Sequence, residues 1–252
     1  LDDLVRIYLY EQVVSTNDTL KEKALAGEPE GSVVLAESQT NGRGRYGRSW
    51  ISKPGKGLYF SLLLRPASVD IQPGLISLLA GLAMVHALKA EQGVSAQVKW
   101  PNDVMVEKAK IAGVLVETLY QEHRLAHAIV GIGLNLLDAG AELDGRFFKA
   151  TSLEHHTRKK IDPDRLLQRI LEEIMKEYRL LSDPVRRQRL CKKWRHHCLH
   201  LNRPVKVIGP HESICGVFRD VDVAGSALIE QNTGEIAVVS AGEFSLQEEI
   251  CF

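Results

Sequence analysis

The chain has 252 residues, and its 32 basic and 32 acidic side chains give a formal charge of zero at pH 7. This balance excludes polyanion binding through overall charge, so any anion site must be local. Four cysteines without paired spacing exclude a disulfide framework, and no apolar stretch approaches the roughly 20 residues that span a bilayer. We therefore expect a cytoplasmic protein that makes no membrane contact.

The first predicted elements alternate between strands and helices. The strands are runs of apolar, β-branched and aromatic residues, and the helices begin at capping residues or proline and stop at Gly27 and Gly93. In chain order they are a strand at 6–14, a helix at 15–27, strands at 32–38 and 58–65, and a helix at 73–93. The segment between the second and third strands is then a loop held at both ends.

Four short apolar runs separated by polar turns come next and predict neighbouring strands of a mainly antiparallel sheet. They lie at 96–100, 103–106, 110–120 and 125–136. A polar segment at 138–160 predicts a long loop. Beyond it, apolar residues at helical spacing predict a helix at 162–181, and a second helix follows from Pro184.

From Arg203 the sequence consists of short β runs between glycine and polar turns, which is typical of a small β-barrel. The predicted fold class is therefore α/β, or α+β, with a mixed, mainly antiparallel sheet followed by a small barrel. We place the two domains at 1–200 and 201–252.

The loop at Gln39–Trp50, QTNGRGRYGRSW, predicts an anion-binding site. Its glycines and arginines are Gly42, Arg43, Gly44, Arg45, Gly47 and Arg48. Glycine lets a backbone approach a ligand closely, and the planar guanidinium holds carboxylate or phosphate with paired hydrogen bonds. Trp50 offers a flat apolar face to a base or ring. For this segment alone, a solvated surface loop or an arginine-glycine tether for nucleic acid is the alternative.

A second group of polar residues lies in KWPNDVMVEKAKIAG. Asn102 and Asp103 stand at a turn and Lys110 begins the return strand, so Asp103 and Lys110 can face one site. There the carboxylate would hold a metal ion or orient the lysine, and the ammonium would neutralise phosphate. The alternative is a turn-favouring Pro-Asn-Asp followed by a solvated lysine.

Two shorter motifs supply further polar groups. The stretch 15–17, STN, stands at a helix start, where hydroxyls and free N–H groups bind a carbonyl or ureido group as readily as they cap the helix. In GIGLNL, Gly131 and Gly133 permit close backbone approach, and Asn135 can project an amide into a pocket. GIGLNL is not a dinucleotide fingerprint, because the third glycine and the following helix are absent.

Taken in order, STN, QTNGRGRYGR-x-W, KWPND with KIAGVLVE, and GIGLN resemble biotin protein ligase. The resemblance runs from about residue 8 to about residue 137, and the tail from NRPVKVIG to GEFSL resembles the small C-terminal SH3-like domain of that family. It implies the biotin/lipoate ligase type of fold, with a biotin- and ATP-binding catalytic domain at 1–200 and the SH3-like domain at 201–252.

The resemblance implies an ATP-dependent reaction in two steps. Biotin's carboxylate attacks the α-phosphate of ATP to give biotinyl-5′-AMP and pyrophosphate, and a lysine of a carrier protein then takes the acyl group. The expected ligands are biotin, ATP and Mg²⁺. The expected partner is the biotin carboxyl carrier domain of acetyl-CoA carboxylase or a similar protein. Because both reacting groups of the first step are anionic, catalysis needs positioning and charge neutralisation.

The resemblance also assigns roles to the residues that match its motifs. The catalytic residues would be Arg45, Asp103 and Lys110, with Asp103 also holding Mg²⁺. Biotin would be bound by Ser15, Thr16, Asn17, Gln39, Gly42, Arg43, Gly44, Arg45 and Lys110. ATP would be bound by Arg45, Arg48, Trp50, Asn102 and Asn135. Arg45 and Lys110 supply the cationic donors that acyl-phosphate formation requires.

Two features depart from the family pattern. Tyr46 stands where the family often has a basic or small residue, so we give it no phosphate role. Only six residues precede IYLYEQVVSTN, too few for the winged-helix domain of repressor members, so we expect no DNA binding by this chain. Because the chain begins at Leu1 rather than methionine, an upstream domain stays an open alternative.

Other functions and sites also stay open. A lipoate or octanoate protein ligase shares the acyl-adenylate logic, and a metabolite-sensing nucleic-acid binder would use the arginine loop for phosphates. The segment 191–200, CKKWRHHCLH, lacks the paired spacing of zinc modules, and we favour a packed helix with solvated histidines. Edge strands of the antiparallel sheet would support a homodimer, and the tail barrel would help to recruit the carrier protein.

Overall fold

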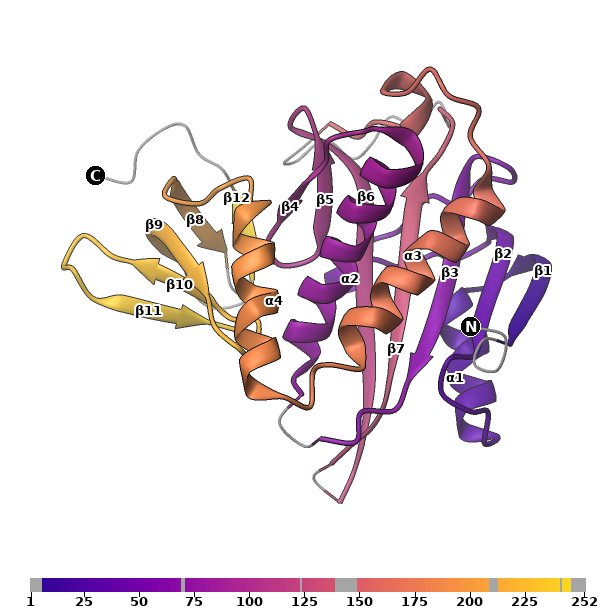
Figure 1. The fold of residues 1–252 in the computed structure, drawn as a ribbon, viewed down its shortest axis with the longest axis horizontal. Helices are drawn as coiled ribbons and strands as arrows, with labels where there is room; N and C mark the ends of the chain where they lie inside the picture. Colours follow the sequence, from indigo (N-terminus) through magenta and orange to yellow (C-terminus); the bar gives the residue numbers. More distant parts are fainter. Residues whose placement is uncertain are drawn as a thin grey trace.

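The computed structural model describes residues 6–68, 71–122, 124–138, 149–208, 213–240 and 242–245. Within them the chain forms a seven-stranded sheet and a five-stranded sheet, with helices beside the larger one (Figure 1). Much of the predicted loop at 138–160 lies outside the described residues, and its later part contains the 3₁₀ turn η3 (Leu153–His155).

The larger sheet is mixed and mainly antiparallel, as predicted. Its strand order is β1 (Ile7–Val13), β2 (Val33–Gln39), β3 (Gly57–Leu64), β7 (Arg124–Asn135), β6 (Ala109–Gln121), β5 (Asp103–Val106) and β4 (Gln97–Lys99). β1 and β2 are parallel, and every other neighbouring pair in this sheet is antiparallel. The long pairing of β6 with β7 sets glycines of the two strands opposite each other.

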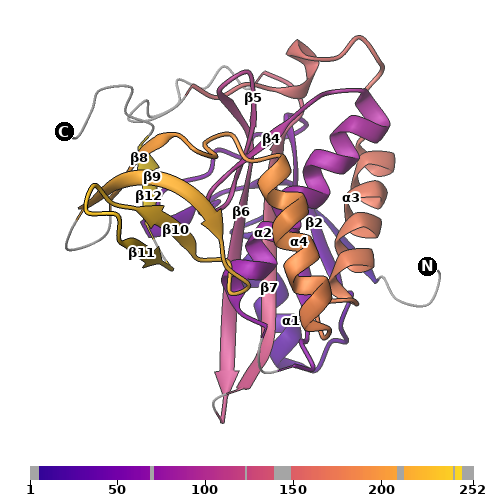
Figure 2. The same cartoon turned by 60° about the vertical axis from the view of Figure 1, so that its left-hand side comes forward.

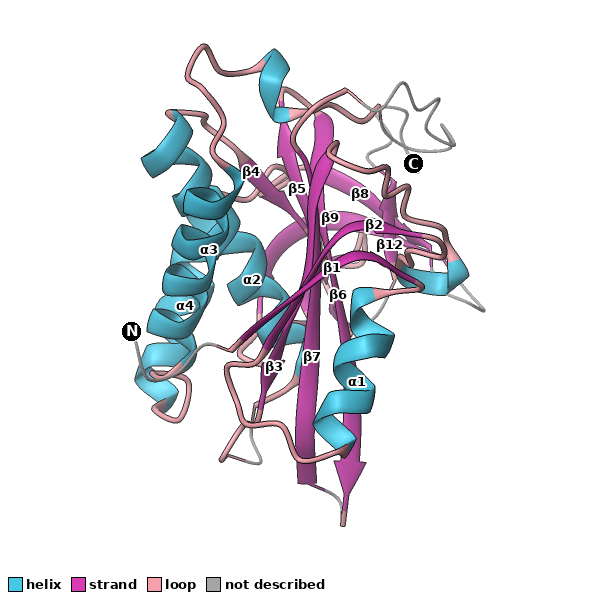
Figure 3. Cartoon of the chain, turned by 90° about the vertical axis from the view of Figure 1, so that its right-hand side faces the viewer, coloured by secondary structure: helices cyan, strands magenta, loops and turns pink. Residues whose placement is uncertain are grey.

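Helices cover both faces of the larger sheet. α1 (Thr16–Leu25) lies on one side, and α2 (Pro73–Ala87), α3 (Pro163–Tyr178) and α4 (Pro184–His196) lie on the other (Figure 3). α2 begins at a proline, continues as the π-helical turn η2 (Leu88–Gln92) and ends at Gly93, which has a φ of 74°. The side chains of Asp162 and Asp183 cap α3 and α4.

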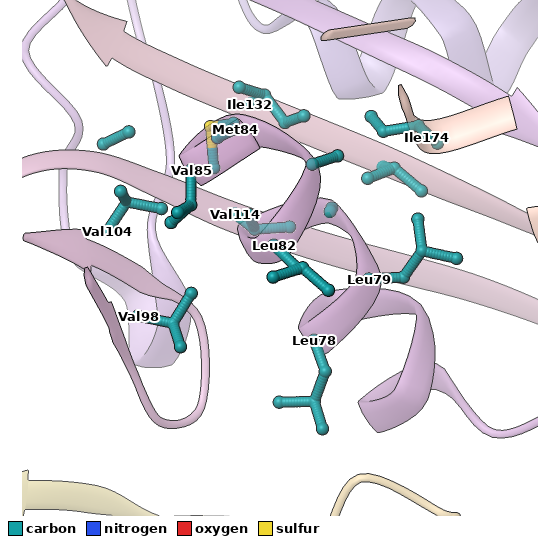
Figure 4. Close-up of a cluster of buried hydrophobic side chains, with 14 of the residues drawn as sticks. Leu78, Leu79, Leu82, Met84, Val85, Val98, Val104, Val114, Ile132 and Ile174 are labelled. Carbon is teal, nitrogen blue, oxygen red and sulfur yellow. The ribbon is translucent and has the colours of Figure 1, made fainter. Parts of the chain in front are cut away.

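α2 is the central helix of the core, between the sheet and the helices α3 and α4 (Figure 2). Leu79 and Leu82 of α2 are each 1% exposed and lie in one cluster with Val114 of β6 and Ile132 of β7 (Figure 4). By length and composition, Pro73–Gln92 would fit a membrane span, which corrects the expectation that no apolar segment is long enough. However, 72% of its apolar 18-residue window is buried inside the protein, as in a core helix.

The second sheet is antiparallel throughout and confirms the short β runs predicted after Arg203. Its order is β11 (Ile236–Val239), β10 (Ala227–Glu230), β9 (Ser213–Val221), β8 (Pro204–Ile208) and β12 (Glu243–Ser245). Its first strand starts close to the predicted domain boundary at 200–201, and that boundary stays a prediction.

The segment 191–200 packs the end of α4 against the second sheet. The rings of Trp194 and His200 both contact Phe218 of β9, with centroid distances of 6.3 and 4.5 Å. His200 is fully buried, so the prediction of solvated histidines was wrong for this residue. Among the described residues, no cluster of three or more His, Cys, Asp or Glu side chains is arranged to hold a metal ion.

A glycine turn between β9 and β10 joins the two sheets. Trp100 Nε1 donates a hydrogen bond of 2.9 Å to the carbonyl oxygen of Gly225. Gly225 has a φ of 87° and lies against the first turn of α2. A β-carbon added at Gly225 would stand 2.5 Å from Leu75 N and 2.7 Å from Gly74 O, so only glycine fits there.

We expect Gly225→Ala to destabilise the protein by about 3 kcal/mol or more, because backbone atoms of α2 would have to move. Gly234→Ala is the matched control: Gly234 has a φ of 84°, but nothing lies within 4 Å of its added β-carbon. The control should show only the left-handed backbone cost of about 1–2 kcal/mol. Urea unfolding measures both variants, and equal losses would show that the close contact is unimportant.

Candidate functional site

A pocket opens where the start of α1, the loop 39–52 and the strands β6 and β7 meet. It is lined by Ser15, Thr16, Asn17, Gln39, Arg43, Gly44, Arg45, Arg48, Ser49, Trp50, Asn102, Asp103, Lys110, Gly113, Val114, Leu115, Gly131, Ile132 and Gly133. The fold therefore brings together all predicted site residues except Gly42 and Asn135. Their roles toward particular ligands stay predictions.

Gly42 and Asn135 are not among the residues that line the pocket. The carbonyl oxygen of Gly42 accepts a 2.8 Å hydrogen bond from Trp50 N, and a β-carbon there would lie 2.8 Å from Ser52 Oγ. Gly42 thus allows the two arms of the loop to pair. Asn135 Nδ2 donates to the carbonyl oxygen of Thr151 at 3.0 Å. The structure therefore does not place the Asn135 amide in the pocket, where contact with ATP was predicted.

Three glycines form the floor of the pocket. Gly113 of β6 is paired with Gly133 of β7, and Gly131 lies two residues along β7 on the same face. A β-carbon at Gly131 would stand 2.9 Å from Asn17 Cγ, and one at Gly133 would stand 2.8 Å from Trp50 Cζ2. Asn17 and Trp50 therefore lie against two glycines on the same face of β7, and these glycines are about 7 Å apart along the strand.

Buried hydrogen bonds fix the polar groups at the Asn17 end. Ser61 Oγ of β3 donates to Asn17 Oδ1 at 2.6 Å and to Thr16 Oγ1 at 2.8 Å in alternative hydroxyl orientations. Gln39 Oε1 accepts from Thr16 N at 2.8 Å, and Gln39 Nε2 donates to Ser52 Oγ at 2.8 Å. These side chains are neutral, so their end of the pocket suits a neutral polar ligand group.

Ser15 occupies the N-cap position of α1, yet it does not cap the helix. The residue is 3% exposed and makes no side-chain hydrogen bond to the first turn. Capping was the alternative explanation for a serine at this position, and the geometry does not support it. A buried hydroxyl that lines the pocket without capping favours the predicted ligand contact.

A buried carboxylate between two ammonium groups forms the other end of the pocket. Asp103 Oδ1 lies 2.6 Å from Lys110 Nζ, and Asp103 Oδ2 lies 3.6 Å from Lys99 Nζ. Burial by itself raises the pKa of Asp103, but the ammonium groups outweigh it and hold the pKa below its ordinary value. Lys110 Nζ also lies 5.2 Å from the Trp50 ring centroid. Two cations and one anion leave this end positive.

This geometry does not fit the predicted magnesium site at Asp103. Both carboxylate oxygens face ammonium groups, so a divalent cation beside them would meet two like charges at close range. Among the described residues, the pocket lining contains no second carboxylate to complete a coordination shell. Of the two roles left open for Asp103, the arrangement therefore favours orientation of Lys110 over metal binding.

The first arginine of the loop is held by carboxylates. Arg43 donates two hydrogen bonds to Asp18 of α1, including one of 2.7 Å from Nη2 to Oδ1, and Arg43 Nη2 lies 3.2 Å from Glu117 Oε2. The hydrogen bond from Arg43 lowers the pKa of Asp18. The Arg43 guanidinium is thus paired with protein carboxylates while it lines the pocket, and its predicted contact with biotin stays a prediction.

Arg45 and Arg48 also line the pocket, and Arg45 contacts Gly242, the residue before β12 of the second sheet. Arg45 Nη1 donates to the carbonyl oxygen of Gly242 at 3.2 Å, and Nη2 donates to Tyr46 Oη at 3.3 Å. Tyr46 lies in the 3₁₀ turn η1 (Arg45–Gly47) with a φ of 57°. Tyr46 therefore contacts the neighbouring guanidinium from an exposed position.

The sequence-based roles omit three polar residues that the fold places at the site: Asp18, Ser61 and Glu117. Ser61 is the only polar side chain in the apolar strand β3 apart from the Tyr59 hydroxyl, and a buried polar residue in such a strand needs a partner. Glu117 continues the alternation of residues 113 and 115 on the pocket face of β6. The sequence therefore contained a signal for Ser61 and one for Glu117.

Comparisons with known proteins agree with this geometry. Residues 9–135 match the sequence model of the biotin/lipoate A/B protein ligase family, and residues 200–247 match that of the biotin protein ligase C terminal domain. The chain therefore belongs to the biotin/lipoate A/B protein ligase family. Both matches confirm the resemblance found from the motifs.

Individual relatives show which branch of the family the chain is similar to. It is 33% identical over 238 residues to "Biotin--[acetyl-CoA-carboxylase] ligase" of Mycobacterium tuberculosis, covering 92% of this chain and 85% of that protein. It is 32% identical over 236 residues to "Bifunctional ligase/repressor BirA" of Bacillus spizizenii, covering 92% and 72%. The structure of biotin protein ligase from Aquifex aeolicus in complex with biotin and ATP matches with a TM-score of 0.82 and 32% identity, over 97% of this chain and 99% of that one.

Replacing Asp103 tests the buried ion cluster. Asp103→Asn removes the negative charge between Lys99 and Lys110, and we expect a loss of about 3 kcal/mol in unfolding free energy at pH 7. Because the folded-state pKa of Asp103 is lowered, its stabilisation is present above about pH 4 and disappears as the pH falls through the folded-state value. Urea unfolding of both proteins between pH 7 and pH 3 should show the difference shrink at the acid end. A constant difference would contradict the ion cluster.

Proposed function

We propose that the chain is an ATP-dependent biotin protein ligase that biotinylates a lysine of a biotin carboxyl carrier protein. The observation that carries the proposal is the glycine floor, which sets a neutral polar end beside a positive end. Biotin has a neutral ureido ring and an anionic carboxylate, and the carboxylate must meet the phosphates of ATP. A pocket with these two ends would hold both parts of the molecule.

In the first step, a carboxylate oxygen of biotin attacks the α-phosphorus of ATP. The new bond gives biotinyl-5′-AMP, and pyrophosphate leaves with the electron pair of the broken P–O bond. Lys110 and Arg45 would neutralise the oxygens that approach each other, and Arg48 would meet the phosphates. Trp50 would pack beside the adenine, and Asn102 would contact the nucleotide. Catalysis is then mainly positioning and electrostatic stabilisation.

In the second step, the ε-amine of a carrier lysine attacks the acyl carbon and AMP leaves. The carrier domain of acetyl-CoA carboxylase fits the names of the relatives, and the second sheet would help to recruit it. Mg²⁺ would enter as the complex with ATP and not as an ion bound by Asp103. A cytoplasmic location is proposed because acyl carriers and ATP are available there.

The lipoate or octanoate ligase alternative receives less support than biotin ligation. The names of relatives similar in sequence refer to biotin or to BirA, and structures of Aquifex aeolicus biotin protein ligase that are 32% identical to this chain contain biotin. A nucleic-acid-binding function is also disfavoured by the pairing of Arg43 with carboxylates, because that pairing removes one cation from the loop.

Substitution of the two cationic groups tests the mechanism. Lys110→Ala and Arg45→Ala should each lower the rate of biotinyl-5′-AMP formation about a hundredfold, since one lost donor costs about 3 kcal/mol of transition-state stabilisation. The control is Arg219→Ala, because Arg219 pairs with Glu230 in the second sheet and is not part of the pocket lining.

Biotin-dependent ATP–pyrophosphate exchange and transfer of labelled biotin to a carrier domain measure the two steps. Undiminished transfer by both pocket variants would remove their assigned roles. Exchange that requires lipoate and fails with biotin would overturn the substrate assignment.

We also propose that the chain forms a homodimer through an edge strand of a sheet. β1 is an edge strand of the larger sheet, and its Leu9 is 73% exposed. Light scattering coupled to size exclusion, with and without biotin and ATP, should detect a mass of two chains. Leu9→Lys should lower that mass by placing charge at the interface. A single-chain mass under every condition would refute the dimer.

A further inference from the structure

We infer that Glu117 is a positioning residue for biotin recognition: its carboxylate holds the Asn17 amide and the Arg43 guanidinium against one wall of the pocket. The inference rests on the proposed function, because it concerns how the pocket is prepared for the ligand proposed there. Glu117 itself is not among the residues that line the pocket, so it acts through its two neighbours.

The register of the sheet places Glu117 at the end of the pocket floor. Residues 113, 115 and 117 of β6 project on one face, and the first two line the pocket. Leu115 is paired with Gly131 and Glu117 is paired with Ile129. Asn17 lies against Gly131, and Glu117 is therefore the next residue on that face of β6 beyond the Leu115–Gly131 pair.

Glu117 fixes the orientation of the Asn17 amide. Asn17 Nδ2 donates to Glu117 Oε2 at 2.6 Å, while Asn17 Oδ1 accepts from Ser61 Oγ at 2.6 Å. An ionised carboxylate accepts hydrogen bonds and donates none, so it selects the nitrogen end of the amide. Asn17 Nδ2 also donates to the carbonyl oxygen of Leu115 at 3.4 Å, so without Glu117 the amide keeps only this long hydrogen bond at its nitrogen end and turns over more readily, exchanging its donor and acceptor. A ligand that is recognised by that pattern would then face a mismatched group.

Glu117 also joins three separate segments of the chain. Arg43 of the loop lies within hydrogen-bonding distance of Glu117 on β6 and of Asp18 on α1. Asp18 directly follows Asn17, so the same ion pairs fix the start of the helix and the start of the loop. Loss of the Glu117 carboxylate would release Asn17 and weaken the anchor of Arg43 together.

The charged clusters at the two ends of the pocket differ in the sign of their net charge. Asp18, Glu117 and Arg43 carry two negative charges and one positive charge, whereas Asp103, Lys99 and Lys110 carry the reverse. An anionic group is disfavoured near the first cluster and favoured near the second. Biotin would therefore bind with its neutral ring toward Glu117 and its carboxylate toward Lys110, which is the orientation that adenylation requires.

The test compares Glu117→Ala and Glu117→Gln with the wild-type chain. Glu117→Ala should raise the KM for biotin about tenfold, the size expected when a hydrogen bond to a charged group is lost, with the KM for ATP within about twofold. Glu117→Gln should give a smaller increase, because its amide oxygen still accepts from Asn17 while the charge beside Arg43 is gone. Biotin-dependent ATP–pyrophosphate exchange measures kcat and both KM values.

Glu230→Ala is the matched control. Glu230 lies on a strand and pairs with an arginine, and its side chain is 36% exposed against 38% for Glu117. It should leave both KM values unchanged. Thermal melting establishes that each variant is folded. If Glu117→Ala does not fold, the isosteric Glu117→Gln still has to raise the KM for biotin selectively.

The possible outcomes separate this inference from the proposed function. A wild-type chain without biotin-dependent exchange would refute the proposed function. Wild-type exchange together with unchanged kinetics in the Glu117 variants would refute only the positioning role. An equal rise in both KM values, or a fall in kcat alone, would also refute it, because neither is selective for biotin. A selective rise in the KM for biotin supports it.

Discussion

The pocket depends on the close approach of two side chains to the backbone of β6 and β7. Asn17 and Trp50 occupy space that β-carbons at Gly131 and Gly133 would fill, and Gly113 leaves the matching gap on the opposite strand. Antiparallel pairing puts Gly113 and Gly133 opposite each other. A flat floor is therefore a property of the strand register and of three glycines, and loops alone would not produce it.

The charges of the site follow from this floor. Its two ends hold clusters of opposite net sign, and each cluster is built around a shared ion: the Arg43 guanidinium at one end and the Asp103 carboxylate at the other. Sharing keeps the central ion charged and leaves each cluster with a net charge of the opposite sign. Lys110 lines the pocket, whereas Asp18 and Glu117 lie outside its lining, so the ligand meets the positive charge directly and neutral polar groups at the other end. The zero net charge of the chain thus conceals a strongly polar pocket.

Sequence patterns predicted most of the helices and strands, and most of the residues that they assigned to the site line one pocket. The apolar runs at 110–120 and 125–136 identified the strands, and the glycines of GIGLNL indicated close approach without showing which side chain approaches. The partner of each charged group was not predictable, because Arg43 meets Asp18 and Glu117 only through contacts between α1, β6 and the loop. For the same reason, the role of Asp103 depended on Lys99, which a turn between two strands places beside it.

A series of hydrogen bonds connects Glu117, at one end of the pocket, to the loop that carries Trp50. From Glu117 they continue through Asn17, Ser61, Thr16, Gln39 and Ser52, and Ser52 Oγ then lies 3.2 Å from the carbonyl oxygen of Trp50. The loop is thus attached at its start by Arg43 and at its end by Ser52, and its tip carries Arg45. Because both stems are tied to the polar end of the pocket, a ligand group bound there contacts the same network that positions Trp50. Recognition of the neutral ring and placement of the aromatic and cationic groups therefore use the same short loop, while the backbone hydrogen bond from Trp50 to Gly42 holds Trp50 independently of Glu117.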